Sequence, residues 1–220
     1  MTIALGVMKD KLKDLKESLQ YALYVCTHPL DGFWDLSREG RGSLAAANVI
    51  IILALIINIL SIQHTSFLFN KVIWEEINII EVVLGFIAPI IIATAANWGL
   101  TTLFDGKGTA REIYMALGYS LTPYVLIQFP LIILSNGLAA DEGAFLAVLS
   151  AFSYVWVGIL IYSAVMQIHD FTPGKAILVI AATIIGMLLI VFVLLLFFSL
   201  ISDAVAYFIS LFKEIAFRFY

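Results

Sequence analysis

Long apolar stretches separated by short polar segments dominate this 220-residue sequence. Five of them reach the length of about 20 apolar residues that an α-helix needs to cross the hydrocarbon core of a bilayer. They cover residues 44–62, 79–103, 113–134, 145–168 and 176–201. The segments between them contain turn-forming residues such as Gly106, Gly108 and Pro173. The pattern therefore predicts five transmembrane helices.

Both ends of the chain are apolar on one side only. From Leu5 to Cys26, apolar residues recur at steps of three and four with lysines between them, which predicts an amphipathic helix. We expect it to lie on the anionic cytoplasmic leaflet, to pack on the transmembrane bundle or to pair with a copy of itself. Residues 202–220 predict a second amphipathic helix, on the outer surface or on a partner. Its thin polar stripe consists of Asp203, Ser210, Glu214 and Arg218.

These elements predict an all-α fold, a polytopic membrane bundle of five transmembrane helices with amphipathic N- and C-terminal helices. Residues 1–42 form the cytoplasmic helix and an elbow, residues 43–201 the five-span domain, and residues 202–220 the tail. In the elbow we expect Pro29 to end the first helix and Asp31 to cap a short second one. Phe33 and Trp34 supply aromatic side chains suited to the membrane interface.

Basic residues predict the orientation, because Lys and Arg favour cytoplasmic loops. One side of the membrane receives Lys9, Lys11, Lys13, Lys16, Arg38, Arg41, Lys107, Arg111 and Lys175. The other side receives Lys71, Lys213 and Arg218. We therefore expect a multi-pass protein of the cell membrane with a cytoplasmic N-terminus and a C-terminus outside.

Composition narrows the class of protein. The chain is 62% hydrophobic and 13% charged, with a mean hydropathy of +1.04, whereas soluble chains average about 45–50% apolar and about 25% charged residues. A soluble domain is thus excluded. The net charge of −4 and the lack of a basic block beyond the N-terminus argue against a nucleic-acid partner. The single cysteine, Cys26, excludes a disulfide within the chain.

The sequence contains no motif for phosphate binding, zinc ligation or a nucleophilic serine. Its three histidines, His28, His64 and His169, occur singly. We therefore expect no enzyme activity, no cofactor and no metal. His169 and Asp170 are interpreted as a pair that caps a loop, with a pH-responsive pair as the alternative. The Gly106-Lys107-Gly108 segment is interpreted as a turn.

Four amide side chains lie within the first four predicted spans: Asn58, Asn97, Gln128 and Gln167. One interpretation is interhelical hydrogen bonding, worth about 0.6 kcal/mol on average in membranes. The other is a polar track that conducts a solute. Prolines at Pro89, Pro123 and Pro130 predict kinks whose freed carbonyls must find other partners.

Two motifs carry a resemblance to a known family. Residues 28–35, His-Pro-Leu-Asp-Gly-Phe-Trp-Asp, and residues 118–123, Gly-Tyr-Ser-Leu-Thr-Pro, resemble the bacterial branch of the Yip (Ypt-interacting protein) domain family. The resemblance extends over about residues 27–201 and implies five spans with a cytoplasmic N-terminus. In eukaryotes it implies vesicle trafficking and binding of small Rab-type GTPases, but the Asp-Leu-Tyr-Gly-Pro motif of that branch is absent here.

Within the second motif, Gly118 is expected to let a neighbouring helix approach, Tyr119 to hydrogen-bond across the bundle, and Pro123 to interrupt its helix. These residues, together with Pro29, Asp31, Phe33 and Trp34 of the first motif, are either structural or a docking site for a partner.

The leading functional hypothesis is a non-enzymatic integral membrane protein that acts as an accessory or interaction subunit of a membrane complex. Its expected partners are membrane lipid, other membrane proteins or a second copy of the chain. The resemblance suggests permease subunits of a carbohydrate ABC transporter among them. The alternative is a small permease or channel subunit with a polar track between kinked helices.

Overall fold

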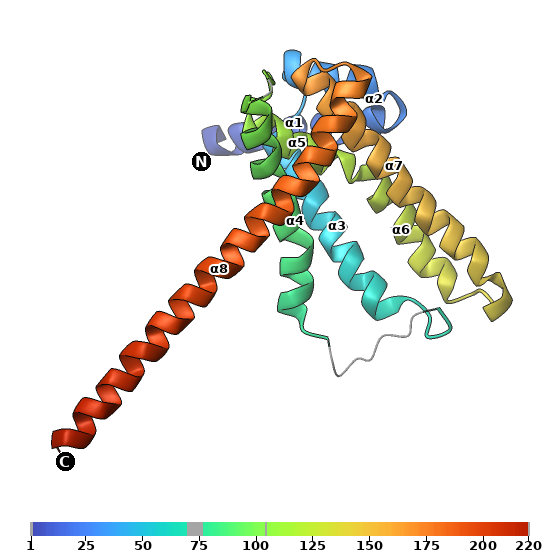
Figure 1. Cartoon of the computed structure of the whole chain (residues 1–220). Helices are drawn as coiled ribbons and strands as arrows, with labels where there is room; N and C mark the ends of the chain where they lie inside the picture. Colours follow the sequence, from blue (N-terminus) through green and yellow to red (C-terminus); the bar gives the residue numbers. More distant parts are fainter. Residues whose placement is uncertain (1, 70–76, 104, 220) are drawn as a thin grey trace.

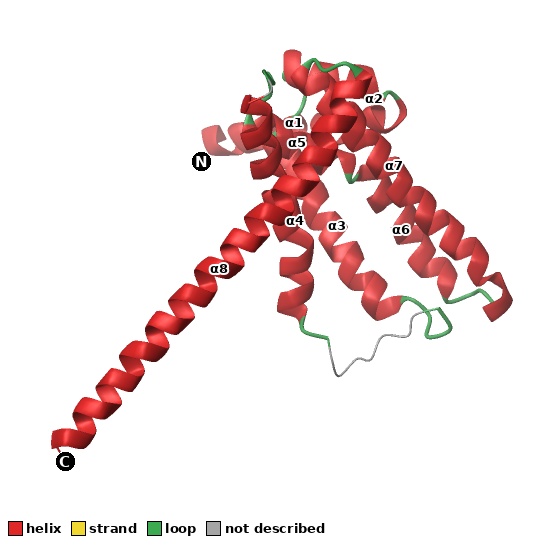
Figure 2. Ribbon diagram, viewed as in Figure 1, coloured by secondary structure: helices red, strands yellow, loops and turns green. Residues whose placement is uncertain are grey.

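The computed structural model describes residues 2–69, 77–103 and 105–219, and within these ranges the side chains of residues 13–218. All regular elements in these ranges are helical, which confirms the predicted all-α class (Figures 1 and 2). The elements are α1 (Thr2–Thr27), α2 (Pro29–Arg38), α3 (Leu44–His64), α4 (Ile79–Leu103), α5 (Ala110–Ser120), α6 (Thr122–Ser135), a short 3-10 turn (Ala140–Glu142), α7 (Gly143–His169) and α8 (Pro173–Phe219).

Five helical segments are long and apolar enough to cross a membrane, as predicted. They are Leu44–His64, Ile79–Leu103, Ala110–Ser135, Ala140–His169 and Pro173–Arg218. In Figure 1, α1 and α2 lie at one end of the bundle, together with the α4–α5 and α7–α8 connections. The end of α3, the start of α4 and the α6–α7 connection lie at the opposite end. The predicted basic side thus coincides with the α1–α2 end, and Lys71, assigned to the other side, lies outside the described residues.

The third span consists of two helices, α5 and α6, which meet at Leu121. Pro123 lies in the first turn of α6 and has no N–H to offer the carbonyl of Tyr119 one turn earlier. That carbonyl instead accepts hydrogen bonds from the Thr122 hydroxyl, at 2.7 Å, and from the Leu121 N–H. The interruption expected at Pro123 therefore exists, and local groups satisfy the freed carbonyl. Pro89 and Pro130 lie inside helices α4 and α6, which continue past them.

The amphipathic N-terminal helix packs on the bundle. Ala22 and Cys26 are buried in the main apolar core, and Leu15 and Leu19 pack against that core. The core also contains residues of α2, α3, α5 and α7. This half of the predicted apolar stripe is thus covered by protein, while the side chains of Leu5, Met8 and Leu12 lie outside those described.

The last helix differs from the prediction. We expected a span ending at residue 201 and a separate tail, but α8 runs from Pro173 to Phe219 without interruption. Neither glycine nor proline follows Gly186, so nothing in the sequence forces the backbone out of the helix. At about 1.5 Å per residue, α8 is about 70 Å long, and Figure 1 shows its C-terminal part projecting away from the bundle.

Helices α4 and α8 form a closely packed pair near the α1–α2 end. A Cβ atom at Gly186 of α8 would lie 3.1 Å from Leu100 Cδ1 and 3.5 Å from Ala96 Cβ, both on α4. A small residue at this position therefore sets the distance between the two helices. The pair faces α5 and α7 across a cavity.

Candidate functional site: a cavity with one polar end

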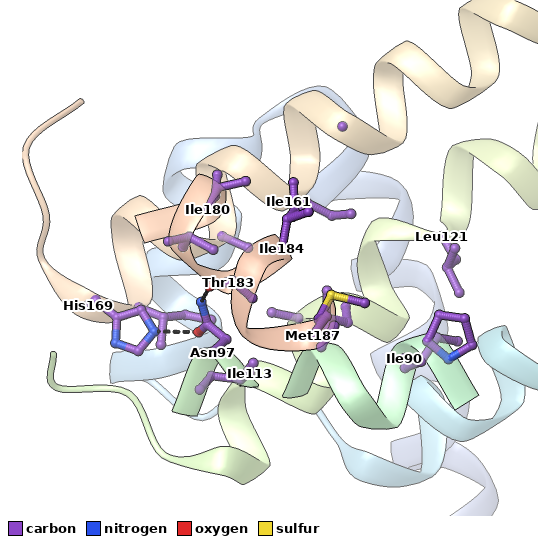
Figure 3. Close-up of a pocket in the computed structure, with 18 residues that line it drawn as sticks. Ile90, Asn97, Ile113, Leu121, Ile161, His169, Ile180, Thr183, Ile184 and Met187 are labelled. Atoms are coloured by element: carbon purple, nitrogen blue, oxygen red, sulfur yellow. Dashed lines mark hydrogen bonds between the residues drawn. The ribbon is translucent and has the colours of Figure 1, made fainter. Parts of the chain in front are cut away.

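The cavity has a volume of about 420 Å³ and lies between α4, α5, α7 and α8. This size falls within the range of about 300–1,000 Å³ typical of small-molecule sites. Most of its lining is aliphatic, but three polar side chains, Asn97, His169 and Thr183, contribute as well. Figure 3 shows these three together at one end, with Ile90, Leu121 and Met187 at the other.

The imidazole of His169 has a defined proton arrangement. Its Nδ1 atom lies 3.1 Å from the backbone N–H of Gly108 and accepts a hydrogen bond from it. The neutral ring must therefore have its proton on Nε2. Nε2 lies 3.0 Å from Oδ1 of Asn97, to which it donates. His169 is only 2% exposed, so both of these bonds are needed to satisfy the buried ring.

The hydrogen-bond chain continues from α4 to the neighbouring helix α8. Because Oδ1 of Asn97 accepts from His169, its Nδ2 group faces Thr183 and donates to Oγ1 at 3.0 Å. The Thr183 hydroxyl donates in turn to the carbonyl of Val179 at 2.7 Å. The chain thus joins α7, α4 and α8. The Nδ2 group of Asn97 has two hydrogens, and the hydrogen bond to Thr183 uses one of them.

The Gly106-Lys107-Gly108 turn covers His169 from outside the bundle. A Cβ at Gly106 would lie 2.8 Å from His169 Nδ1, and a Cβ at Gly108 would lie 2.7 Å from His169 Cε1. Both distances are too short for any side chain. The two glycines therefore allow the backbone to approach the ring closely enough for the Gly108 N–H to bind it.

Asp170, at the surface of the same end of the bundle, links the end of α7 to α2 and to Lys107. It adopts the left-handed conformation, with φ of 53°, and its N–H bonds to the carbonyl of Met166 at the end of α7. Its carboxylate pairs with Lys107 Nζ at 2.7 Å and with the Arg38 guanidinium of α2. Hydrogen bonds from Lys107 and then from Arg38 hold the pKa of Asp170 below its usual value. His169 and Asp170 thus hold the loops together, as the loop-capping interpretation predicted.

Gly118 and Tyr119 of the second motif join α5 to α3 and α1. A Cβ at Gly118 would lie 3.0 Å from Ala47 Cβ and 3.2 Å from the Ala47 carbonyl oxygen, so helix α3 approaches α5 at a glycine, as predicted. The buried Tyr119 hydroxyl accepts from the Ser43 N–H at 3.2 Å and donates to the Ser18 carbonyl at 3.3 Å.

The elbow motif lets α2 pack against α1. Pro29 begins α2, and Trp34 is 42% exposed, as an aromatic residue at the membrane interface would be. Phe33, which we expected at that interface too, is instead fully buried in the main core. Asp31 does not cap the helix. The N-cap residue is His28, without a side-chain hydrogen bond, and Asp31 lies in the first turn, because proline at the first helical position already starts the helix two residues earlier.

The four amides do not gather around the cavity. Asn97 lines it, whereas Gln128 of α6 donates to Ser150 and Ser153 of α7 at 2.9 and 2.8 Å. Asn58 and Gln167 are half-buried and are not among the lining residues. Gln128 therefore makes the interhelical bonds expected of it, and Asn97 alone of the four faces the cavity.

Sequence reasoning missed His169 and Thr183 as partners of Asn97. A usable signal was present, because all three lie within about two to three helical turns of a loop on the same side of the membrane. Within the described ranges, no three His, Cys, Asp or Glu side chains gather as they would to hold a metal ion.

Comparison with known proteins places this architecture in a family. Searches of curated proteins and of solved structures returned no match to this chain. A family model described as the Yip1 domain matches residues 23–212, a range that includes α2 to α7, both sequence motifs and all the residues lining the cavity. With most of its length matched by this model, the chain belongs to the Yip1 domain family of multi-pass membrane proteins.

Proposed function

We propose that this chain is a non-enzymatic membrane protein that binds another membrane protein through the C-terminal part of α8. The observation that supports this proposal most directly is the exposure of α8, where every residue from 191 to 218 is exposed. Many of these residues are large and apolar, including Phe192, Phe198, Phe208 and Phe212. A helix that is apolar on all sides requires lipid or protein around it.

The length of α8 favours protein as part of that cover. About 20 residues suffice to cross the hydrocarbon core of about 30 Å, so a span beginning near Ala176 is complete close to residue 196. More than 20 further residues of the same helix follow. Phe208, Phe212 and Phe217 in that extension are at least 58% exposed. Because contact of such side chains with water is unfavourable, the extension needs a binding partner.

The partner we propose is a permease subunit of a membrane transport complex, with a carbohydrate ABC transporter as the specific candidate. The resemblance of residues 28–35 and 118–123 to bacterial Yip domain proteins supports this choice. We also propose that the α1–α2 end is cytoplasmic and the end of α8 outside, since Arg38, Arg41 and Lys107 lie at the α1–α2 end. A topology reporter fused after Tyr220 tests the orientation, and activity in the cytoplasm would contradict it.

Site-specific photo-crosslinking in living cells tests the binding of a partner. A photoreactive phenylalanine analogue replaces Phe192, Phe198, Phe208 or Phe212, one at a time, in the full chain. Phe129 of α6 and Phe152 of α7 serve as matched controls, since each is 50% exposed on another helix. After illumination, the α8 positions should give one protein adduct of constant mass, and the control positions should not give it.

Protein adducts at none of the α8 positions, with lipid adducts in their place, would contradict the proposal. An adduct of twice the mass of the chain would identify a second copy as the partner and would overturn the permease assignment. Mass spectrometry of the adduct distinguishes these outcomes.

The cavity supports a second candidate function, a small permease. Asn97 faces the cavity between α4, which contains Pro89, and the other helices, as a solute site would require. Liposomes containing the purified protein test this function by measuring flux of sugars and ions. If correctly folded protein gives no flux of sugars or ions, it is not a permease.

A further inference from the structure

The cavity combines apolar walls with a single polar end. Its walls come from four helices, and Asn97, His169 and Thr183 gather where α4 and α7 end and α8 begins. The opposite end, near Pro89 and Met187, lies about halfway along α4 and well into α8. The cavity therefore extends from the polar end near the α1–α2 side toward the middle of the membrane. An occupant of matching chemistry has one polar end and one apolar chain.

The apolar part of the cavity is unsuited to water. A buried water molecule needs two to four polar partners, and no polar side chain in the described part of the chain lines the cavity between Leu121, Gly158 and Met187. Helices α4 and α8 belong to segments able to cross a membrane, so the medium around this cavity consists of lipid chains. An apolar chain is thus both available and compatible with the walls.

The polar end selects a neutral head group that accepts a hydrogen bond. Among the described residues, no charged side chain lines the cavity, and burial of an unpaired phosphate or carboxylate there would be very costly. Asn97 is 4% exposed, and one of its two Nδ2 hydrogens is committed to Thr183. The other can bind an oxygen acceptor within the cavity. A hydroxyl oxygen meets this requirement without a charge.

From these observations we infer that the cavity is a binding site for a neutral single-chain lipid with a hydroxyl-bearing head group, such as a long-chain alcohol. The head group oxygen accepts from Asn97 Nδ2, and the chain extends between α7 and α8 toward Met187. This site is separate from the exposed part of α8, so the outcome of its test does not depend on the partner proposed above.

Photolabelling of the full-length protein in lipid nanodiscs tests the inference. The probe is a long-chain alcohol with a photoreactive diazirine in its chain, and the matched probe is the same chain without the hydroxyl. Mass spectrometry should locate adducts of the alcohol on cavity residues of α7 and α8. Loss of one neutral hydrogen bond should weaken labelling by the hydrocarbon probe about three- to tenfold. Unlabelled alcohol should compete with its probe.

Two glycines provide matched variants. A Cβ at Gly158 or at Gly99 meets no atom within 4 Å, but only Gly158 lines the cavity. Gly158→Leu should therefore fill the cavity and abolish adducts on its walls, whereas Gly99→Leu should leave them unchanged. Met187→Trp fills the far end of the cavity and replaces Gly158→Leu if that variant fails to fold.

Equal labelling by the alcohol and the hydrocarbon would overturn the inferred head group selectivity. Labelling that persists in both cavity-filling variants would show that the probe binds elsewhere and would overturn the site itself.

Discussion

Replacing His169 by Phe removes both hydrogen bonds of its ring while keeping an aromatic side chain against Phe171, whose ring centroid lies 5.2 Å away. The variant leaves Oδ1 of the buried Asn97 and the half-buried N–H of Gly108 without these partners. An unsatisfied buried group costs about 1–3 kcal/mol, and Gly108 adds less because solvent can reach it. We therefore expect a loss of about 1–4 kcal/mol in the free energy of unfolding.

For a chain of this length, about 1 kcal/mol corresponds to about 2–4 °C in Tm. His169→Phe should thus lower the Tm of the protein in detergent by about 2–16 °C. Size-exclusion chromatography after heating measures this change. His64→Phe is the matched control, because His64 is exposed at the opposite end of the bundle. Equal Tm values for both variants and the unmodified protein would refute the assignment of the hydrogen-bond chain.

Three further predictions concern other parts of the fold. Gly118→Leu should reduce the free energy of unfolding by about 1–3 kcal/mol, because its side chain would force Ala47 and helix α3 away, and unfolding in a denaturing detergent measures this loss. In the Asp170→Asn variant, the Tm should decrease less on acidification than it does in the unmodified protein. The pairs with Lys107 and Arg38 lower the pKa of Asp170 and so stabilise the folded state at pH values above the usual pKa of 3.8. This contribution is lost as the pH falls through the lowered pKa. Cys26 should react slowly with maleimide at neutral pH, as counted by mass spectrometry, because burial raises its pKa to about 11.

Each of these predictions has its own control. Gly85→Leu introduces the same side chain where no atom lies within 4 Å, and an equal loss in both glycine variants would contradict the close approach of α3. If the Tm decreases equally on acidification in Asp170→Asn and in the unmodified protein, the pairs with Lys107 and Arg38 do not affect stability. Labelling of Cys26 as fast in the folded protein as after unfolding would contradict its burial.

The apolar pattern was sufficient to predict the five spans, because the length of a span depends on the thickness of the bilayer rather than on tertiary contacts. The same holds for Pro123, whose missing N–H interrupts the third span wherever the helix is placed. Capping at Asp31 was predicted wrongly because Pro29, assigned from the sequence to the end of the preceding helix, occupies the first position of α2 instead.

The end of the last span shows a limit of the same reasoning. Ser202 and Asp203 indicated a boundary by polarity, but α8 continues through both. A polar pair alone does not end a helix, since each residue still forms its backbone hydrogen bonds. Whether apolar residues beyond that point meet lipid, protein or water depends on neighbours that the sequence does not describe.

By itself, the sequence determined the all-α class, the five spans, the packing glycine at Gly118 and a likeness to a family. These features follow from local properties of the chain: hydrophobic length, proline geometry and residue size. Only the tertiary structure decided that Asn97 meets His169 and Thr183, residues 72 and 86 positions away, and that Gln128 joins a different group. Such contacts depend on how each helix is rotated and how deeply it is inserted relative to its neighbours. A helix that is apolar on every face gives no periodic signal for either quantity.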